Sequence, residues 1–232
     1  MKKALSLFLF VCIALANANA QSEKFYTTSG GEVIFSFADV EYQNLSIPTN
    51  MRFTLFFHMG QFLHYDLTNN FGTYSGIGLR NIGFITEDNG IKDKRRTYSL
   101  GIPLALKIGN FNKNFYIYAG GEYELFFHYK HKRFVDDTKK KYREWFSDRT
   151  NRFVPAVFGG LQFPGGINLK FKYYLDNFLN EDVEVTEFGE TVDYSEFNKT
   201  QVFYIALTFN IRPDIFMDFS GPKEKVTRLS YN

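Results

Sequence analysis

Large apolar side chains alternate strictly with small or charged ones between Thr97 and Ile108. One parity consists of Tyr98, Leu100, Ile102, Leu104, Leu106 and Ile108. Because successive side chains of a strand point to opposite faces, the pattern predicts a strand with one apolar face. A strand of about a dozen residues exceeds the usual globular length of about five or six, and it is long enough to cross a bilayer at a tilt.

The same alternation recurs along the rest of the chain. Further strands are predicted at about residues 32–38, 51–65, 71–85, 115–129, 153–163, 167–175 and 203–211. Short turns at 67–70, 110–114 and 164–166 alternate with longer connections at 39–50, 86–94, 130–151 and 180–198. Transmembrane barrels sort their connections in this way, with short periplasmic turns and longer outer loops. The pattern therefore predicts an all-β fold, an eight-stranded antiparallel up-and-down transmembrane β-barrel over residues 21–211.

The volume of the bulky side chains decides which way the apolar face points. Eight strands enclose an interior that side chains just fill, and about forty large apolar groups would exceed that space. The opposite parity consists mainly of small and charged residues, which would fit inside. We therefore expect the bulky face to point outward, toward lipid. A soluble β-sandwich, with this face buried between two sheets, is the alternative.

Charged residues on the inward parity are expected to meet in the lumen. They are Arg52, Arg80, Lys107, Glu122, Glu124, Lys170, Lys172 and Asp176. Because an unpaired charge in a narrow lumen would be costly, we expect them to form an ion-pair network that plugs the barrel. The lumen is accordingly predicted to be polar and to contain no open pore.

The first 20 residues have the composition of a cleaved signal peptide. A basic start at Lys2 and Lys3 precedes an apolar run over 4–15, and Ala18-Asn19-Ala20 supplies small residues for cleavage. A membrane-anchoring helix is the alternative, although the run is shorter than the about 20 residues that a helical span needs. The single cysteine, Cys12, lies in this segment, so the cleaved chain is expected to have neither disulfides nor thiolate metal sites.

Charge and hydropathy narrow the range of partners. Removing Lys2 and Lys3 from the 27 basic residues leaves 25, which equals the 25 acidic residues. A balanced chain of this kind is not expected to bind nucleic acid. No other stretch approaches 18 uninterrupted apolar residues, so helical membrane spans are not expected. Residues 212–232 depart from the alternation and are predicted to form a periplasmic C-terminal tail.

Two of the predicted outer loops carry opposite charge. The candidate interaction residues are Lys139, Lys140, Lys141, Arg143 and Trp145 in one loop and Glu184, Glu187 and Glu190 in the other. Simple solvation of two surface loops would account for these charges. Alternatively, the loops pair over the mouth of the barrel, or the basic loop grips lipid phosphates or an acidic partner. Trp145 would serve either alternative as an amphipathic anchor.

Candidate catalytic and metal-binding residues are few. His58 and His64 share a parity but lie roughly 20 Å apart along a strand, too far apart to share a metal ion. His128 with Glu124 would imitate the His/acid site of a lipid A-modifying enzyme at the rim of the barrel, but no serine nucleophile lies in a suggestive position. We therefore expect no enzymatic activity, no metal and no cofactor.

The signal-type N-terminus, the alternating strands and the stretch Leu100-Gly-Ile-Pro-Leu-Ala-Leu-Lys107 resemble a known group. They are similar to the outer-membrane β-barrel proteins of Bacteroidota, the PorT-like group, and more distantly to the OmpA and OmpX barrels. The resemblance covers about residues 21–211. It implies the cell outer membrane as the location and outer-membrane lipid, lipopolysaccharide and phospholipid, as a partner. The charged outer loops and the tail are the candidate sites for a protein partner. The resemblance brings no catalytic residues.

Four functions remain open at this point. The first is a non-enzymatic barrel that serves as a structural, adhesion or complex-forming component through its charged outer loops. The others are a rim-located lipid A-modifying enzyme, a narrow channel, and a secretion-associated component of PorT type, which the resemblance alone implies.

Overall fold

The computed structural model describes residues 24–136 and 138–211. The predicted signal peptide, residues 1–20, and the predicted tail, residues 212–232, lie outside this described part of the chain. Within the two ranges, no helix is both long and apolar enough to span a membrane.

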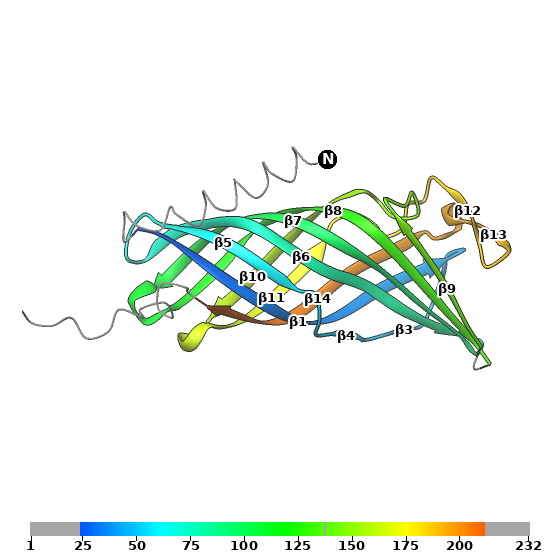
Figure 1. Cartoon of the computed structure of the whole chain (residues 1–232), viewed down its shortest axis with the longest axis horizontal. Helices are drawn as coiled ribbons and strands as arrows, with labels where there is room; N and C mark the ends of the chain where they lie inside the picture. The colour runs from blue at the N-terminus through cyan, green and yellow to red at the C-terminus, as the bar shows by residue number, and fades with distance from the viewer. Residues whose placement is uncertain (1–23, 137, 212–232) are drawn as a thin grey trace, which may run out of the picture.

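Eight long strands form a closed ring (Figure 1). They are β1 (Phe25–Tyr42), β5 (Met59–Asp66), β6 (Phe71–Asp88), β7 (Ile91–Asn110), β8 (Phe115–Val135), β10 (Phe153–Gln162), β11 (Ile167–Tyr174) and β14 (Lys199–Ile211). Each strand is antiparallel to the next one along the chain, and β14 pairs with β1 to close the ring. The predicted eight-stranded antiparallel up-and-down barrel is confirmed. The alternative of two packed sheets is excluded, because the ring has no open edge.

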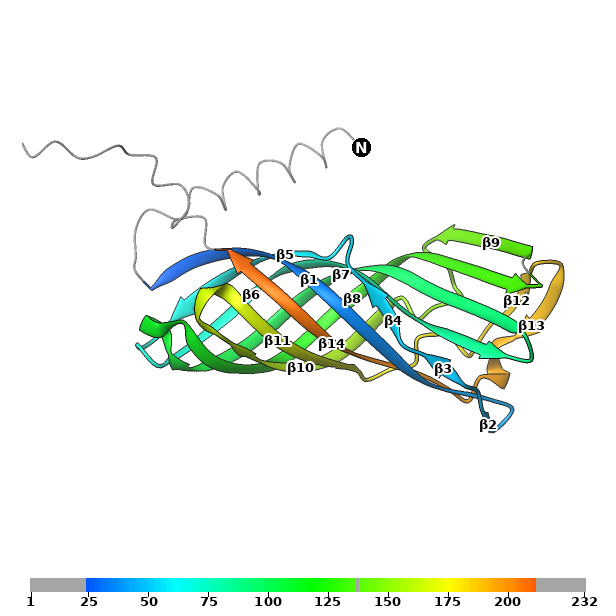
Figure 2. The same ribbon diagram turned by 90° about the horizontal axis from the view of Figure 1, so that it is seen from below.

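The connections divide the barrel into two different ends. Short turns, which include the 3₁₀ turns η2 (Phe111–Lys113) and η3 (Pro164–Gly166), lie at the turn end, where β1 begins and β14 ends. The long connections lie at the opposite loop end, with β9 (Thr138–Trp145), β12 (Glu184–Glu187), β13 (Glu190–Asp193) and η4 (Tyr194–Glu196). Figure 2 shows β9, β12 and β13 together at this end.

Two predicted outer loops are largely strand, which corrects the sequence-based boundaries. β6 and β7 continue through residues 86–94 to a tight turn in which Asn89 and Gly90 have φ of 48° and 78°. Positive φ at both central residues is typical of the hairpin turn that Asn-Gly favours. In the same way β8 extends to Val135 and pairs with β9 inside the predicted loop 130–151. These strands continue because their backbone groups pair with each other beyond the barrel wall.

The predicted strand 51–65 is interrupted, which its alternation does not reveal. The first connection contains β2 (Leu45–Ser46), β3 (Thr49–Asn50) and β4 (Arg52–Thr54). Ser36 of β1 pairs with Arg52, but Gly31 pairs with Met59. The register of the pairing along β1 therefore changes between these two contacts. The intervening residues 55–58 leave the sheet.

The bulky apolar parity faces outward, as predicted. On β7, Leu100, Ile102 and Leu104 are 40%, 61% and 65% exposed, whereas Ala105 and Lys107 of the other parity are buried. The same arrangement recurs on β8, β10, β11 and β14. About ten residues from Tyr98 to Ile108 advance about 34 Å along the strand, and a tilt of about 40° reduces this to about 26 Å in height. This height matches the apolar band of about 25 Å that surrounds membrane-spanning barrels.

The interior near the loop end contains an apolar core that the prediction of a polar lumen did not include. Residues 175–198 between β11 and β14, here termed the capping loop, fold into the mouth. Phe178, Leu179, Tyr194 and Phe197 of this loop are buried in one core with wall residues such as Phe126. The sequence prediction treats residues 180–198 of this segment as a polar loop, because acidic residues dominate it.

Candidate functional site

Six charged side chains form a central ion cluster inside the barrel. The cluster consists of Glu32 from β1, Arg80 from β6, Glu122 and Glu124 from β8, and Lys170 and Lys172 from β11. Each points inward because it lies on the parity opposite to the apolar belt. The three cations and three carboxylates balance one another, and all six side chains are at most 7% exposed.

Arg80 holds the cluster together. Its Nε lies 3.1 Å from Glu32 Oε2, and its Nη1 contacts Glu122 and lies 3.3 Å from Glu124 Oε1. Because the guanidinium offers several donors in a planar fork, a single side chain can pair with all three carboxylates.

The two lysines complete the cluster from the opposite wall. Lys172 Nζ lies 2.7 Å from Glu122 Oε2 and also contacts Glu124, while Lys170 Nζ lies 2.8 Å from Glu32 Oε1. Tyr174 donates its hydroxyl hydrogen to Glu124 at 3.1 Å. A buried ionic network is tolerated when every member is paired in this way, and removing one member leaves an uncompensated charge.

The cluster contains five of the eight lumen residues singled out from the sequence, and the other three lie elsewhere. Lys107 is buried nearer the turn end, where its Nζ contacts Asp66 and the Tyr26 hydroxyl. Arg52 belongs to the first connection and donates to Asn81 rather than to a carboxylate. Asp176 is exposed beyond the end of β11 and forms no ion pair in the described chain. The predictions that Arg52 and Asp176 each form an ion pair in the lumen are therefore wrong.

Glu32 is the member of the cluster that the sequence prediction missed. It lies on the inward parity of β1, opposite to Val33, Phe35 and Phe37, and its side chain is 5% exposed. The sequence prediction considered only the apolar residues of this strand. The parity of Glu32, opposite to that of the apolar residues, would have placed it inside.

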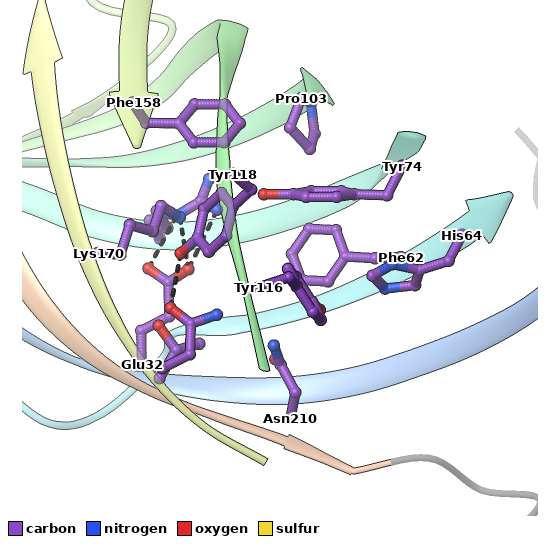
Figure 3. Close-up of a pocket in the computed structure, with 13 residues that line it drawn as sticks. Glu32, Phe62, His64, Tyr74, Pro103, Tyr116, Tyr118, Phe158, Lys170 and Asn210 are labelled. Carbon is purple, nitrogen blue, oxygen red and sulfur yellow. Dashed lines mark hydrogen bonds and ion pairs between the residues drawn. The ribbon is translucent and has the colours of Figure 1, made fainter. Parts of the chain in front are cut away.

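A small cavity of about 20 Å³ lies between the central ion cluster and the turn end (Figure 3). Figure 3 shows Glu32 and Lys170 on one side of it, facing the rings of Tyr74, Tyr116 and Tyr118. A cavity of this size has room for about one ordered water molecule. The lumen is therefore narrow at this level as well as at the cluster.

A second polar group, here termed the cap, ties the capping loop to the wall. Its members are Asp93 from β7, His131 and Arg133 from β8, Arg149, Glu187 from β12 and Tyr194 from η4. The buried His131 ring lies between two carboxylates, with Nε2 2.9 Å from Asp93 Oδ1 and Nδ1 2.8 Å from Glu187 Oε2.

Glu187 is the member through which the capping loop is held. Besides His131, it accepts from the Tyr194 hydroxyl at 2.9 Å and from Arg149 Nε at 3.2 Å. Asp93 is held in turn by Arg133, whose Nε and Nη2 lie 2.9 and 3.0 Å from its oxygens. The cap therefore joins β7, β8, the segment before β10 and the capping loop in one network.

The cap makes the stability of the loop end depend on pH. Burial raises the pKa of Asp93, but hydrogen bonds from His131 and Arg133 outweigh it and hold this pKa well below its usual value. The pKa of Glu187 is lowered by His131 against the same effect of burial. A lowered pKa in the folded state means that the stabilisation is fully present above the ordinary value of about 4 and is lost as the pH falls below it.

We therefore expect the capping loop to be equally protected from hydrogen exchange at pH 7 and pH 5 and to lose protection below about pH 4. Exchange measured by mass spectrometry after short labelling, corrected for the intrinsic pH dependence, provides the check. In Glu187→Gln, which lacks one of the two titrating carboxylates, the acid transition should be smaller than in the unaltered chain. Protection that declines steadily from pH 7 to pH 5 would contradict this origin.

The outer-loop residues singled out from the sequence divide into two groups. Glu187 is buried in the cap, and Glu190 reaches Arg133 at 3.4 Å, but Glu184 is exposed. The basic residues Lys139, Lys140, Lys141 and Arg143 are exposed on β9, and Trp145 is 63% exposed. In the described chain no ion pair joins them to the capping loop. The two loops are connected through His131, Arg133 and Arg149 instead.

The His128–Glu124 pair that the sequence suggested as a candidate site does not form. The pairing of β7 with β8 shifts register between Tyr98 and Ser99, so one extra residue enters β8 at Phe127. A bulge of this kind exchanges the two faces of the strand beyond it. His128 therefore faces outward and stacks on Trp145 at 4.1 Å, whereas Glu124 stays in the central ion cluster. The same shift turns His131 inward, into the cap.

Comparison with protein-family models gives no match, and comparison with curated proteins gives none. Several solved structures are similar, among them the following three. Ail of Yersinia pestis, the attachment invasion locus protein, solved with the heparin analogue sucrose octasulfate, is 12% identical over 80% of this chain and 99% of its own, with a TM-score of 0.37. Neisserial surface protein A is 9% identical over 82% and 97%, with a TM-score of 0.39. The outer membrane protein OprG of Pseudomonas aeruginosa is 11% identical over 82% and 96%, with a TM-score of 0.36.

Proposed function

We propose that the chain is a non-enzymatic β-barrel of the cell outer membrane. Its lumen is plugged, and its charged loop end serves as a structural, adhesive or complex-forming surface. The observation that carries the proposal is the combination of an outward apolar belt with a lumen filled by the central ion cluster. An exterior of this kind favours an apolar surrounding such as lipid over water, and an interior of this kind excludes a wide aqueous path.

Two further observations support a plugged barrel rather than a narrow channel. The capping loop fills the mouth with apolar side chains, and the cap fixes it to two wall strands. A permeant ion would have to displace this core and then break the pairs around Arg80. Both steps are costly, because they expose apolar surface and isolate buried charges.

The structure does not contain the His128–Glu124 pair on which the alternative of a lipid A-modifying enzyme at the rim depended. His128 and Glu124 lie on opposite faces of β8, and both ring nitrogens of His131 already contact carboxylates. Mass spectra of lipid A from cells with and without the protein check this part of the proposal, and we expect identical spectra. A mass difference that depends on the protein would overturn it.

The plugged lumen is tested by ion conductance in planar bilayers. We expect the purified barrel to insert without a steady conductance step, because the central ion cluster and the capping loop close the lumen at two levels. A porin of known conductance, reconstituted in the same lipid, serves as the positive control for insertion. Reproducible open-channel steps from the unaltered chain would favour the channel alternative.

A further inference from the structure

The outward face of the β7–β8–β9 sheet carries two complete rows of basic side chains. The pairing places Arg96, Lys130 and Arg143 side by side in one row, and Lys94, Lys132 and Lys141 side by side in the next. The six residues are termed the cationic face. Figure 2 shows the three strands adjacent to one another at the loop end. The register shift at Phe127 creates this face, because it turns Lys130 and Lys132 outward.

The side chains of the cationic face are not paired with carboxylates in the described part of the chain. In the described part of the chain, none of its six side chains forms an ion pair or a side-chain hydrogen bond, although Lys130 and Lys94 lie over the rings of Tyr98 and Phe134. Side chains directly opposite on paired strands have Cβ atoms about 5 Å apart, so like charges there destabilise the sheet.

The like charges in the two rows act on the pKa of the central lysine of each row. Partial burial and the charges of Arg96 and Arg143 lower the pKa of Lys130. Partial burial and the charges of Arg96, Lys139, Lys141 and Lys94 lower the pKa of Lys132. A bound polyanion would relieve this repulsion in both rows at once.

The position of the face along the barrel identifies the kind of anion. The next row toward the turn end is Tyr98, His128 and Trp145, and the exposed apolar belt begins immediately beyond it at Leu100. Aromatic side chains of this kind lie at the level of lipid headgroups. The two basic rows follow within about 7 Å and 14 Å of that aromatic row, at the depth of the headgroup phosphates.

On the premise of the proposed membrane barrel, we propose that the cationic face binds the phosphate groups of lipids in the leaflet that surrounds the loop end. Arg96 and Arg143 offer planar forks that match phosphate oxygens, and the four lysines add point charges around them. Continuity with the apolar belt favours a lipid over a soluble polyanion, since acyl chains and phosphates would be contacted together.

The chain supplies its own reporter for this binding. Trp145 is its single tryptophan, and it lies in the aromatic row next to the cationic face. The folded barrel is reconstituted in phosphatidylcholine vesicles that contain increasing fractions of phosphatidic acid. In parallel samples either lipid carries brominated acyl chains, which quench a tryptophan in contact with them. The ratio of the two quenching curves gives the relative affinity of the face for the phosphate-rich headgroup.

We expect the unaltered barrel to prefer phosphatidic acid about tenfold and Lys132→Gln/Lys141→Gln to lose most of that preference. Lys113→Gln/Lys140→Gln is the matched control, because it also removes two positive charges, one at the turn end and one on the other face of β9. This control should keep the preference. Equal quenching by both lipids in the unaltered barrel, or an unchanged preference in Lys132→Gln/Lys141→Gln, would overturn the proposal.

Two further outcomes show which part of the proposal is wrong. Added inorganic polyphosphate should not displace the lipid, and displacement at low concentration would assign the face to a soluble polyanion instead. If neither brominated lipid quenches Trp145, the aromatic row does not contact the bilayer, and the proposed headgroup site is overturned even where the apolar belt spans the membrane.

Discussion

Replacing Arg80 with methionine is expected to destabilise the barrel by about 3–5 kcal/mol, the usual loss when one partner of a buried ionic network is removed. The substitution leaves Glu32, Glu122 and Glu124 facing only two lysines, and the whole cluster is shielded from water. The free energy of unfolding is measured by urea titration of the folded protein in detergent micelles. Trp145 fluorescence and circular dichroism provide independent signals.

Two variants distinguish loss of charge balance from loss of packing. Arg152→Met removes an exposed arginine that pairs with Asp148, and we expect a change of at most about 1 kcal/mol. Arg80→Met/Glu122→Gln restores equal numbers of cations and carboxylates, so part of the stability should return. An Arg80→Met variant as stable as the unaltered chain would show that the central ion cluster does not stabilise the barrel.

Replacing Glu187 with glutamine is expected to release the capping loop without unfolding the barrel. Glutamine keeps the size of the side chain but removes the charge that His131 and Arg149 contact. A hydrogen bond to a charged group contributes about 1.5–3 kcal/mol, so local opening of the loop should become about tenfold to a hundredfold more frequent. Hydrogen exchange of residues 175–198, followed by mass spectrometry at pH 7, measures this opening.

The same experiment includes matched substitutions that should have no effect. Glu184→Gln removes an equal charge from an exposed position on the same strand as Glu187. Lys139→Glu, Lys140→Glu and Lys141→Glu reverse charges that do not contact the capping loop. Faster exchange in the lysine variants would support direct pairing of these lysines with the capping loop, one of the alternatives that the sequence leaves open. Unchanged exchange in Glu187→Gln would show that the cap does not anchor the capping loop.

The fold is largely predictable because two simple quantities determine it. Side chains alternate with a period of two on every strand, so the spacing of Leu100, Ile102 and Leu104 along the chain is enough to define one face. The total volume of such residues then decides that the face points outward. Neither argument needs long-range contacts, which explains why the eight strands and their orientation are predicted correctly.

The ends of the strands and the contents of the loops are predicted poorly for a related reason. Beyond the apolar belt, both faces of β7 and β8 carry polar residues, and alternation no longer distinguishes strand from loop. In the capping loop the apolar residues Phe178, Leu179 and Tyr194 are separated by acidic stretches. Their burial depends on the space that the closed ring leaves at its mouth, which no local pattern reports.

The candidate sites likewise divide into residues that the sequence predicts and residues that it does not. Arg80, Glu122 and Lys172 are predictable because inward parity and opposite charge suffice to bring them together in a narrow lumen. The cap and the cationic face are not, because both depend on the bulge at Phe127. One inserted residue moves His131 inward and Lys130 outward, and nothing in the adjacent sequence indicates which residue the ladder omits.

For this protein the amino-acid sequence alone determined an eight-stranded barrel with its apolar residues outside and balanced charges inside, because periodicity and volume are properties of the chain itself. The tertiary structure decided which charges meet, where the faces of β8 exchange and how the capping loop enters the mouth. These features depend on strand register and on the shape of the enclosed space, and both exist only after the ring has closed.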